Sequence, residues 1–472
     1  MLAAHTVADV RRAEQGLADD TGWDVLMQRA ARGLADILDD RLPPGATPVV
    51  LVGPGHNGGD ALFAAAHLGE RGRRVNLCLL DPDRVHGPGL AAALAAGASV
   101  VDSPRGHTHL VDAVFGIGAR PGLEGPAAEW ARWQREEDPW TLAVDVPSGV
   151  DVDGGTLPGE HLLADVTVTF GTLKPALLLG PAADAAGDVV LVDIGLGPHL
   201  ATPAVETFTP DDGPPAGHRM TGDGPEHKYS RGVLGVAAGS EAYAGAAHLV
   251  VAGAQAGPAG MIRFAGSAEL GRRVVDRAPE VVAGPGRVQA WVVGPGGDDG
   301  TAELVRAALT EQVPVLLDAT ALQSLPDRFD VPALLTPHAG ELARMLGVSR
   351  DDVDDDPWGH ARAAASRWGA TVLLKGRRTL VVPPEGPTRA NRSGTRWLAT
   401  AGTGDVLAGL AGAWLAAGLT PLEAGSVAAH LHGAAGVRAN PGGPVTASGV
   451  AAAVPAVTAD FLAGDLHRVR DW

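Results

Sequence analysis

The stretch PVVLVGPGHNGGDALFAAAHL (residues 48–68) places a glycine-rich turn between an apolar run and a helical pattern. The apolar run predicts a buried strand, and the Ala/Leu pattern after the turn predicts a helix. Gly53, Gly55 and Gly58 satisfy the spacing G-x-G-x-x-G, which is typical of loops that bind dinucleotide phosphates at a helix N-terminus. Asp81 ends the next apolar run, where a ribose-binding acid is expected. The first hypothesis is therefore a nicotinamide dehydrogenase.

Two features argue against that hypothesis. The loop continues into Asn57 and Asp60, and a carboxylate at a helix start would repel the pyrophosphate that the helix dipole attracts. A lone G-x-G-x-x-G in a glycine-rich chain is also more often an ordinary turn than a cofactor site. We therefore interpret Asp81 as a turn residue and expect the loop to meet hydroxyl groups or to take part in chemistry.

Composition narrows the class of protein. A chain of 472 residues predicts two or three domains. The formal charge of −18 argues against nucleic-acid and anionic-membrane partners. No apolar run is long enough to span a bilayer, and no stretch resembles a signal peptide. Cys78 is the single cysteine and lies in an apolar run, which predicts a core residue in a protein of the reducing cytoplasm.

Strand-like and helical segments alternate twice along the chain. Two helices come first, with Thr21 placed to cap the second. The apolar runs VVLVG, VNLCLL, HLVDAVFG, TLAVDV, DVTVTFG and DVVLVDIG then alternate with helices, which predicts a doubly wound parallel sheet. After a Pro/Gly/Asp-rich segment, the alternation restarts with VLGVAAG, QAWVVGPGG, VPVLLDA, PALLTP and TVLLKG. We expect an α/β protein with one domain over residues 1–208, a linker over 209–227 and a second domain over 228–472.

Three loops of the first domain carry polar residues at strand ends. The loop GPGHNGGD holds Asn57 and Asp60, VDAVFGIGARPG holds Asp112, and AVDVPSG holds Asp145 and Ser148. In a doubly wound sheet such loops converge on one edge, where two glycine loops could approach phosphates. The oxygens of Asn57, Asp112 and Ser148 suit a hard monovalent or divalent cation rather than zinc, and Asp145 is a candidate acid/base. The alternative is that each Asp only caps a helix or a turn.

These three segments resemble the signature segments of the NAD(P)H-hydrate epimerase domain, which has a Rossmann-like fold. That family interconverts the two C6 epimers of hydrated NADH and NADPH. The resemblance implies that Asp145 is the acid/base and that Asn57, Asp112 and Ser148 hold a potassium ion. It also implies hydrate contacts at His56, Asn57, Gly58, Gly59, Asp60, Gly116, Ile117, Gly118, Ala119, Arg120, Pro121, Gly122 and Asp145. His56 stands where the family usually has Asn, and Ala61 where Gly is usual.

The most specific motif of the second half is TAGTGDVLAGLAG (residues 400–412), in which GTGD opens a helix. Its backbone N–H groups would form an anion hole, and Asp405 could activate a hydroxyl for phosphoryl transfer. Alternatively, Asp405 is only a helix cap. In LLKGRRTLVV, Lys375 and the donors through Thr379 suit a nucleotide phosphate, unless Lys375 and Arg378 are solvated residues of a hairpin. His338, in LLTPHAGE, could equally be structural.

The segments HKYSRGVLGVAAGS, YAGAAHL, VVGPGG, LLDATAL, LLTPHAGE, LLKGRRTLVV and AGTGDVLAG, in this order, resemble the ribokinase-like ADP-dependent NAD(P)H-hydrate dehydratase. That family phosphorylates the C6 hydroxyl from ADP and then eliminates phosphate, restoring the reduced coenzyme. The resemblance implies Asp405 as the catalytic residue and a Mg²⁺ requirement. It implies hydrate contacts at Ala246, Gly296, His338 and Asp405, and nucleotide contacts at Lys375, Gly376, Arg377, Arg378, Thr379 and Gly404.

The two resemblances occur in the order of a known bifunctional fusion and together cover nearly the whole chain. We therefore expect a cytoplasmic enzyme, both isomerase and lyase, that repairs hydrated nicotinamide coenzymes. Because members of the family tend to form multi-subunit assemblies, the resemblance also implies a homo-oligomer. The alternative is a ribokinase-like kinase for a vitamin or sugar hydroxyl, fused to a non-catalytic module that binds nucleotide-like ligands.

Overall fold

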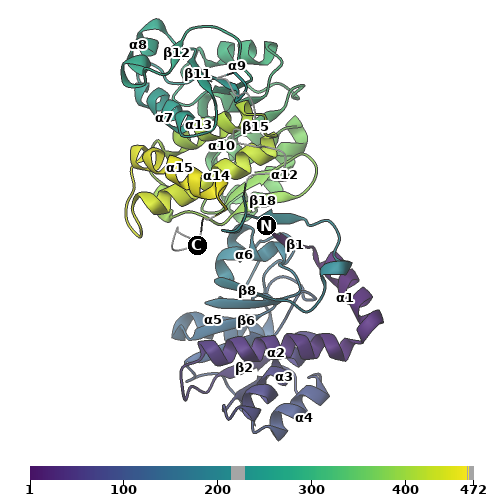
Figure 1. Ribbon diagram of the computed structural model, residues 1–472. Helices are drawn as coiled ribbons and strands as arrows, with labels where there is room; N and C mark the ends of the chain where they lie inside the picture. The colour runs from purple at the N-terminus through teal and green to yellow at the C-terminus, as the bar shows by residue number, and fades with distance from the viewer. Residues whose placement is uncertain (214–228, 465, 467–472) are drawn as a thin grey trace. The chain divides into compact units, whose positions relative to one another are not determined.

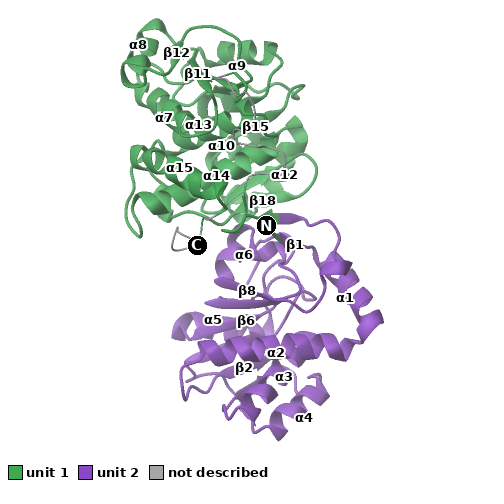
Figure 2. Cartoon of the chain, in the orientation of Figure 1, with its two compact units in different colours: residues 1–2, 206–472 green, residues 3–205 purple. Residues whose placement is uncertain are grey.

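A computed structural model of the chain describes residues 1–213, 229–464 and 466 (Figure 1). The chain divides into two compact units, Ala3–Val205 and Glu206–Trp472 together with Met1–Leu2 (Figure 2). Most of the predicted linker (209–227) lies outside the described residues, because the structure does not describe residues 214–228. Residue 228, the expected start of the second domain, lies outside them as well. The predicted domain boundaries therefore stay predictions. In the described part of the chain, no helix combines the length and the apolar character needed to cross a membrane.

The first unit is built on a seven-stranded sheet of order β4-β3-β2-β5-β6-β7-β8, in which every neighbouring pair is parallel. Its strands are β2 (Val49–Val52), β3 (Asn76–Leu79), β4 (Ser99–Val100), β5 (His109–Ala113), β6 (Trp140–Val144), β7 (Val166–Phe170) and β8 (Asp188–Val192). The predicted doubly wound sheet is therefore confirmed. The strand order reverses between β2 and β5, so the loops after these two strands flank the point where such sheets bind ligands.

Helices cover both faces of this sheet. They are α1 (Val7–Thr21), α2 (Trp23–Arg41), α3 (His56–Glu70), α4 (Gly87–Ala95), α5 (Gly125–Glu137) and α6 (Gly180–Ala185), with the short 3₁₀ helices η1 (Pro175–Leu177) and η2 (Gly197–His199). Alternate residues of β2 point to opposite faces, so Val50 joins the core under α2 and α3 whereas Leu51 joins the core under α5. The strands β1 (Leu2–Ala4) and β9 (Val205–Thr207) lie where the division between the units falls.

One predicted cap is wrong. Thr21 is the last residue of α1, and its hydroxyl donates a hydrogen bond to the carbonyl oxygen of Leu17 at 2.8 Å. Gly22 lies between the two helices with a φ of 90°, and α2 begins without a side-chain cap. The chain turns here on a glycine because this region of φ is costly for residues with a Cβ.

The second unit is built on a larger sheet whose strands follow the order β18-β17-β16-β15-β14-β13-β10-β11-β12. They are β10 (Val233–Ala237), β11 (Met261–Phe264), β12 (Val282–Ala283), β13 (Ala290–Val293), β14 (Val315–Leu317), β15 (Ala333–Leu335), β16 (Thr371–Leu374), β17 (Thr379–Val382) and β18 (Thr388–Asn391). All pairs are parallel except β16–β17 and β17–β18. Every residue of β13 to β16 is buried, so both faces of this part of the sheet are covered.

Two helices of the second unit meet at backbone distance. A Cβ added to Gly409 in α13 (Thr403–Ala416) would lie 1.9 Å from the carbonyl oxygen of Val250 in α7 (Ala244–Gln255). A Cβ added to Gly253 would lie 2.1 Å from the carbonyl oxygen of Val406. The remaining helices are α8 (Ala268–Arg277), α9 (Thr301–Thr310), η3 (Ala319–Gln323), α10 (Ala339–Leu346), α11 (Arg350–Asp355), α12 (Pro357–Trp368), η4 (Arg396–Leu398), α14 (Pro421–Ala439) and α15 (Ala447–Leu462).

Candidate functional site

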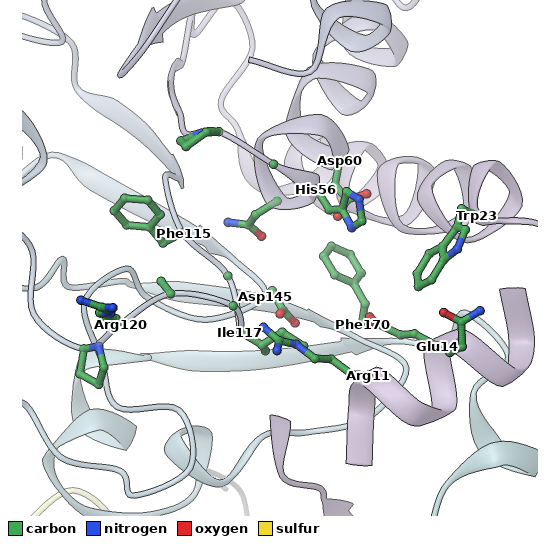
Figure 3. A pocket seen from close by; sticks show the side chains of 18 of the residues that line it. Arg11, Glu14, Trp23, His56, Asp60, Phe115, Ile117, Arg120, Asp145 and Phe170 are labelled. Atoms are coloured by element: carbon green, nitrogen blue, oxygen red, sulfur yellow. The ribbon is translucent and has the colours of Figure 1, made fainter. Parts of the chain in front are cut away.

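A cavity of about 890 Å³ lies in the first unit, where the loops after β2, β5 and β6 meet (Figure 3). Its lining brings together most of the residues predicted to contact a hydrate: His56, Asn57, Asp60, Gly116, Ile117, Gly118, Ala119, Arg120, Pro121, Gly122 and Asp145. Gly58 and Gly59 are buried and do not line it. The lining also includes residues that the sequence did not indicate, from α1 (Arg11, Glu14 and Gln15), α2 (Trp23) and the end of β7 (Phe170).

Backbone geometry accounts for the glycines of the G-x-G-x-x-G motif. A Cβ on Gly53 would lie 1.7 Å from the carbonyl oxygen of Val114, because the loops after β2 and β5 touch there. Gly55 has a φ of 103°, and a Cβ on Gly58 would lie 2.2 Å from the carbonyl oxygen of Gly53. The motif is therefore explained by close packing of the two loops, and its glycines alone do not identify a cofactor.

His56 forms one wall of the cavity. Its ring lies 5.9 Å from that of Trp23 between centroids, with the planes tilted by 40°. Trp23 remains 45 % exposed and begins α2. The pair therefore presents an aromatic surface at the position where the resemblance expects Asn. No local pattern identified Trp23 as a site residue, because α1 and α2 precede every recognised motif.

Asp145 has an unusual backbone conformation, and its carboxylate is paired with a buried lysine. Its φ is 68°, in the left-handed region that Asn, Asp and Gly tolerate best. Lys174 is 1 % exposed, and its ammonium donates to Asp145 Oδ1 at 2.5 Å, to Thr169 Oγ1 at 2.9 Å and to the carbonyl oxygen of Phe170 at 3.0 Å. All three ammonium donors are thus used. Lys174 was not predicted as a site residue. The scarcity of lysine in this chain could have singled it out as a candidate.

Two further carboxyl groups, those of Asp60 and Glu14, face the same cavity (Figure 3). Burial, together with the negative charges of Asp145 and Glu14, raises the pKa of Asp60 well above its ordinary value, although Lys174 opposes the shift. Burial and the charge of Asp145 also raise the pKa of Glu14, with Lys174 and Arg11 opposing. The cavity therefore combines one ion-paired carboxylate with two carboxyl groups that hold their protons more tightly than usual.

The three predicted cation ligands occupy neighbouring positions beside this cavity. Asp112 is completely buried, and it accepts hydrogen bonds from Ser148 Oγ at 2.6 Å and from the backbone N–H of Ser148 at 2.7 Å. Burial raises the pKa of Asp112 to about 6 despite the bonds from Ser148. Asn57 lies against the next loop, since its Oδ1 is 3.1 Å from a Cβ built on Gly116. Within the described residues, the buried Nδ2 of Asn57 has no hydrogen-bond partner.

This donor set is of the kind that suits a hard monovalent or divalent cation. The carboxylate of the buried Asp112, the hydroxyl of the buried Ser148 and the amide oxygen of Asn57 are oxygen ligands, and such ligands suit hard cations. Among the described residues, no group of three or more His, Cys, Asp or Glu side chains could hold a metal ion. The assignment of Asn57, Asp112 and Ser148 as cation ligands stays a prediction.

The second unit has its own cluster of charged residues at strand ends. Lys375 Nζ lies 2.7 Å from Asp318 Oδ1 and 3.9 Å from Glu341 Oε2. Burial lowers the pKa of Lys375, but the negative charges of Asp318, Glu341 and Asp405 outweigh burial and raise it. Lys375 is therefore an ion-paired lysine and not a solvated hairpin residue. Asp318 was not predicted as a site residue, although an acid directly after a buried strand was a signal.

Asp405 is not a helix cap. Gly402 is the N-cap of α13, and that helix start has no side-chain cap hydrogen bond. Burial and the nearby charge of Asp318 raise the pKa of Asp405 to about 6, with Lys375 opposing the shift. A Cβ on Gly404 would lie 3.6 Å from Lys375 Nζ, so the start of α13 faces this lysine. A carboxyl with such a pKa can accept a proton near neutral pH.

The other residues predicted for the second unit lie at related positions. A Cβ on Gly296, which has a φ of 61°, would lie 2.4 Å from the Cβ of Ala246, so these two predicted hydrate contacts are neighbours. His338 caps α10, because its Nδ1 accepts a hydrogen bond from the backbone N–H of Glu341 at 3.2 Å. One ring nitrogen of His338 therefore has a structural role, as the alternative interpretation of this residue expected. Gly376, Arg377 and Arg378 form the turn between β16 and β17, and Thr379 begins β17.

Comparisons with known proteins cover both units. Residues 23–176 match the family described as YjeF-related protein N-terminus, and residues 234–448 match the family described as NAD(P)H-hydrate dehydratase. The bifunctional NAD(P)H-hydrate repair enzyme Nnr of Mycobacterium tuberculosis is 44 % identical over 89 % of this chain and 90 % of its own length. The protein of that name from Corynebacterium glutamicum is 35 % identical over 88 % of this chain and 87 % of its own.

A solved structure of the ADP/ATP-dependent NAD(P)H-hydrate dehydratase from Bacillus subtilis, co-crystallized with ATP/Mg²⁺, is 28 % identical. It matches 51 % of this chain and 93 % of its own with a TM-score of 0.48. The M. tuberculosis relative, by contrast, spans nearly the whole of this chain at high identity. The chain therefore belongs to the family of bifunctional NAD(P)H-hydrate repair enzymes.

Proposed function

We propose that this enzyme repairs hydrated NADH and NADPH in two steps, one in each unit. The first unit interconverts the R and S epimers at C6, and the second dehydrates the S epimer at the expense of ADP, giving AMP and phosphate. One observation supports this division of labour most directly. Each unit places a candidate catalytic carboxyl close to a lysine: Asp145 is paired with the buried Lys174, and Asp405, in the first turn of α13, is near enough to the half-buried Lys375 for that charge to affect its pKa.

In the epimerase unit, the hydrate would lie in the cavity against the loops of residues 56–60 and 116–122, with Asp145 as the acid/base. Asn57, Asp112 and Ser148 would hold a potassium ion, which would supply a counter-charge to the buried Asp112 carboxylate. The hydrogen bonds from Ser148 to Asp112, and from the backbone N–H of Phe115 to Ser148 Oγ at 2.9 Å, already join two of the three loops. This network would fix the loops that orient the substrate.

In the dehydratase unit, Asp405 would take the proton of the C6 hydroxyl as that oxygen attacks the terminal phosphorus of ADP. The backbone N–H groups at the start of α13 would stabilise the charge that develops on the transferred group. Phosphate then leaves C6 as the neighbouring carbon loses a proton, which restores the reduced ring. The nucleotide would be held, with Mg²⁺ on its phosphates, by Lys375, Gly376, Arg377, Arg378, Thr379 and Gly404. The hydrate would contact Ala246, Gly296, His338 and Asp405.

A repair assay tests this proposal. The full chain is incubated with the R or the S epimer of hydrated NADH, with ADP or ATP and Mg²⁺, and the NADH absorbance band is followed. We expect recovery from both epimers, with the R epimer depending on prior epimerisation. No recovery from either epimer by folded protein would contradict the proposal, and a stable phosphorylated product would favour a small-molecule kinase instead. Sedimentation of the same preparation tests the homo-oligomer that the family's habit implies.

The dehydratase is expected to lose activity in mild acid. The pKa of Asp405 is raised to about 6, so the proton-accepting carboxylate predominates only above that pH. Below it, kcat/KM for dehydration should fall about tenfold per pH unit, because the fraction of ionised Asp405 falls by that factor. Initial rates across pH 5 to 8, corrected for buffer blanks, measure the effect. A profile that stays flat through pH 6 would exclude Asp405 as the base.

A further inference from the structure

The epimerase cavity contains two acidic side chains with very different surroundings. The carboxylate of Asp145 is bound by Lys174 and by the hydroxyl of Thr169, which donates to it at 3.1 Å. The carboxyl of Asp60 projects from the second turn of α3 into the same cavity (Figure 3). In the described part of the chain it has no hydrogen-bond or ion-pair partner. One acid is thus tied to a cation, and the other is free to meet a ligand.

The charges around Asp60 favour its neutral form. Glu14 and Asp145 face it with negative charge, and Lys174, the buried cation of the group, is already bonded to Asp145. Burial is the largest cause that raises the pKa of Asp60, and the charges of Asp145 and Glu14 add to it while Lys174 opposes it. The other titratable groups on the cavity wall are Arg11, His56, Arg120 and Glu124, and a smaller adjoining pocket adds Asp24 and His86. A protonated Asp60 can donate a hydrogen bond or a proton, whereas the lysine-bound Asp145 can only accept one.

We propose that Asp60 is the proton donor and Asp145 the proton acceptor when the cavity inverts C6 of the R hydrate. This inference rests on the epimerase activity proposed above. Inversion requires that a bond to C6 break on one face and form again on the other, so it requires an acid and a base in different positions. Asp60 comes from α3 and Asp145 from the end of β6, and Figure 3 shows them approaching the cavity from different elements.

The reaction balances with water as the only co-reactant. The C6 oxygen takes the proton of Asp60 and leaves as water, while the lone pair of the ring nitrogen forms a double bond to C6. A second water attacks C6 from the opposite face, and its proton passes to Asp145. The nitrogen recovers its lone pair as the new C6–O bond forms. One proton has then moved from Asp60 to Asp145, and exchange with solvent restores both groups.

Isotope labelling tests this route without any variant. The full-length enzyme and R hydrate are incubated in H₂¹⁸O without ADP, the epimers are separated, and their masses are measured against an enzyme-free blank. We expect the newly formed S epimer to carry ¹⁸O at C6. Inverted product that retains its original oxygen would overturn the proposal, because the C6–O bond would then never have broken. If the wild-type enzyme forms no S epimer at all, the epimerase function itself fails.

Substitution identifies the donor. Asp60→Asn keeps the size of the side chain but removes the acid, so we expect epimerisation to fall by about 10²–10⁴-fold. Asp60→Glu should restore part of the activity, and dehydration of the S epimer should be unchanged in both variants. Asp40→Asn, at an exposed position near the end of α2, is the matched control. Epimerisation by Asp60→Asn within about threefold of wild type would overturn the assignment.

Discussion

Asp405→Asn is expected to lower kcat for dehydration by about 10²–10⁴-fold and to leave epimerisation at the wild-type rate. The amide occupies the volume of the carboxyl but cannot take a proton from the C6 hydroxyl. Since Asp405 makes no capping hydrogen bond, the start of α13 should remain intact. The two rates are measured in one preparation, dehydration by NADH absorbance with S hydrate and ADP, and epimerisation by chromatography without nucleotide.

The matched control for this change is Asp354→Asn. Asp354 lies in α11 of the same unit, is about half exposed and pairs with Arg350 at the surface, so its loss should leave both rates unchanged. Nucleotide binding to Asp405→Asn, followed by calorimetry, should stay close to that of the wild type. Loss of both activities in a folded Asp405→Asn protein would contradict the assignment of one activity to each unit.

Lys174→Met is expected to destabilise the first unit by about 3–5 kcal/mol and to abolish epimerisation. Removing one partner of a buried ion pair leaves the other charge without compensation. Here the change also leaves Thr169 and the carbonyl oxygen of Phe170 without the donor that they share. Hydrogen exchange resolved by peptide measures the stability of each unit within the full chain, and the second unit should be unaffected.

The double variant Asp145→Asn, Lys174→Met distinguishes a charge effect from a packing effect. Replacing both partners removes the uncompensated charge, so the double variant should recover part of the stability that Lys174→Met loses. It should still lack epimerase activity, because it has no acid/base at residue 145. Equal loss of stability in the single and double variants would show that Lys174 acts through packing alone.

The strands that the sequence predicted are those with long apolar runs. β2 and β13 are buried along their whole length, and such strands give a continuous hydrophobic signal. Several of the strands that were missed are short, exposed or polar: β4 and β12 have two exposed residues each, and β18 reads TRAN. The strand β11, which reads MIRF, was also missed, although two of its four residues are buried. Edge and hairpin strands depend on their neighbours for pairing, so their own residues predict them poorly.

The residues of the candidate sites also fall into two groups, those that a sequence pattern could indicate and those that it could not. Residues within one motif, such as Asn57 and Asp60, are placed together by the local turn and helix, so a sequence pattern can indicate them. Glu14, Lys174 and Asp318 reach their sites from segments far away in the sequence. Their roles depend on which strands become neighbours, and no local spacing encodes that. The same motif also contains Gly58 and Gly59, which are needed for packing and do not line the cavity.

The left-handed backbone at Asp145 has a consequence for how this enzyme can evolve. That conformation restricts residue 145 largely to Gly, Asn and Asp, and of these only Asp titrates. Replacement of Asp145 by Gly or Asn would suit the backbone, but it would leave the buried ammonium of Lys174 without its carboxylate partner. Neither residue can therefore change alone without penalty. In lineages that abandon epimerisation, we expect residues 145 and 174 to be replaced together, leaving a folded unit that has lost its acid/base and its lysine at the same time.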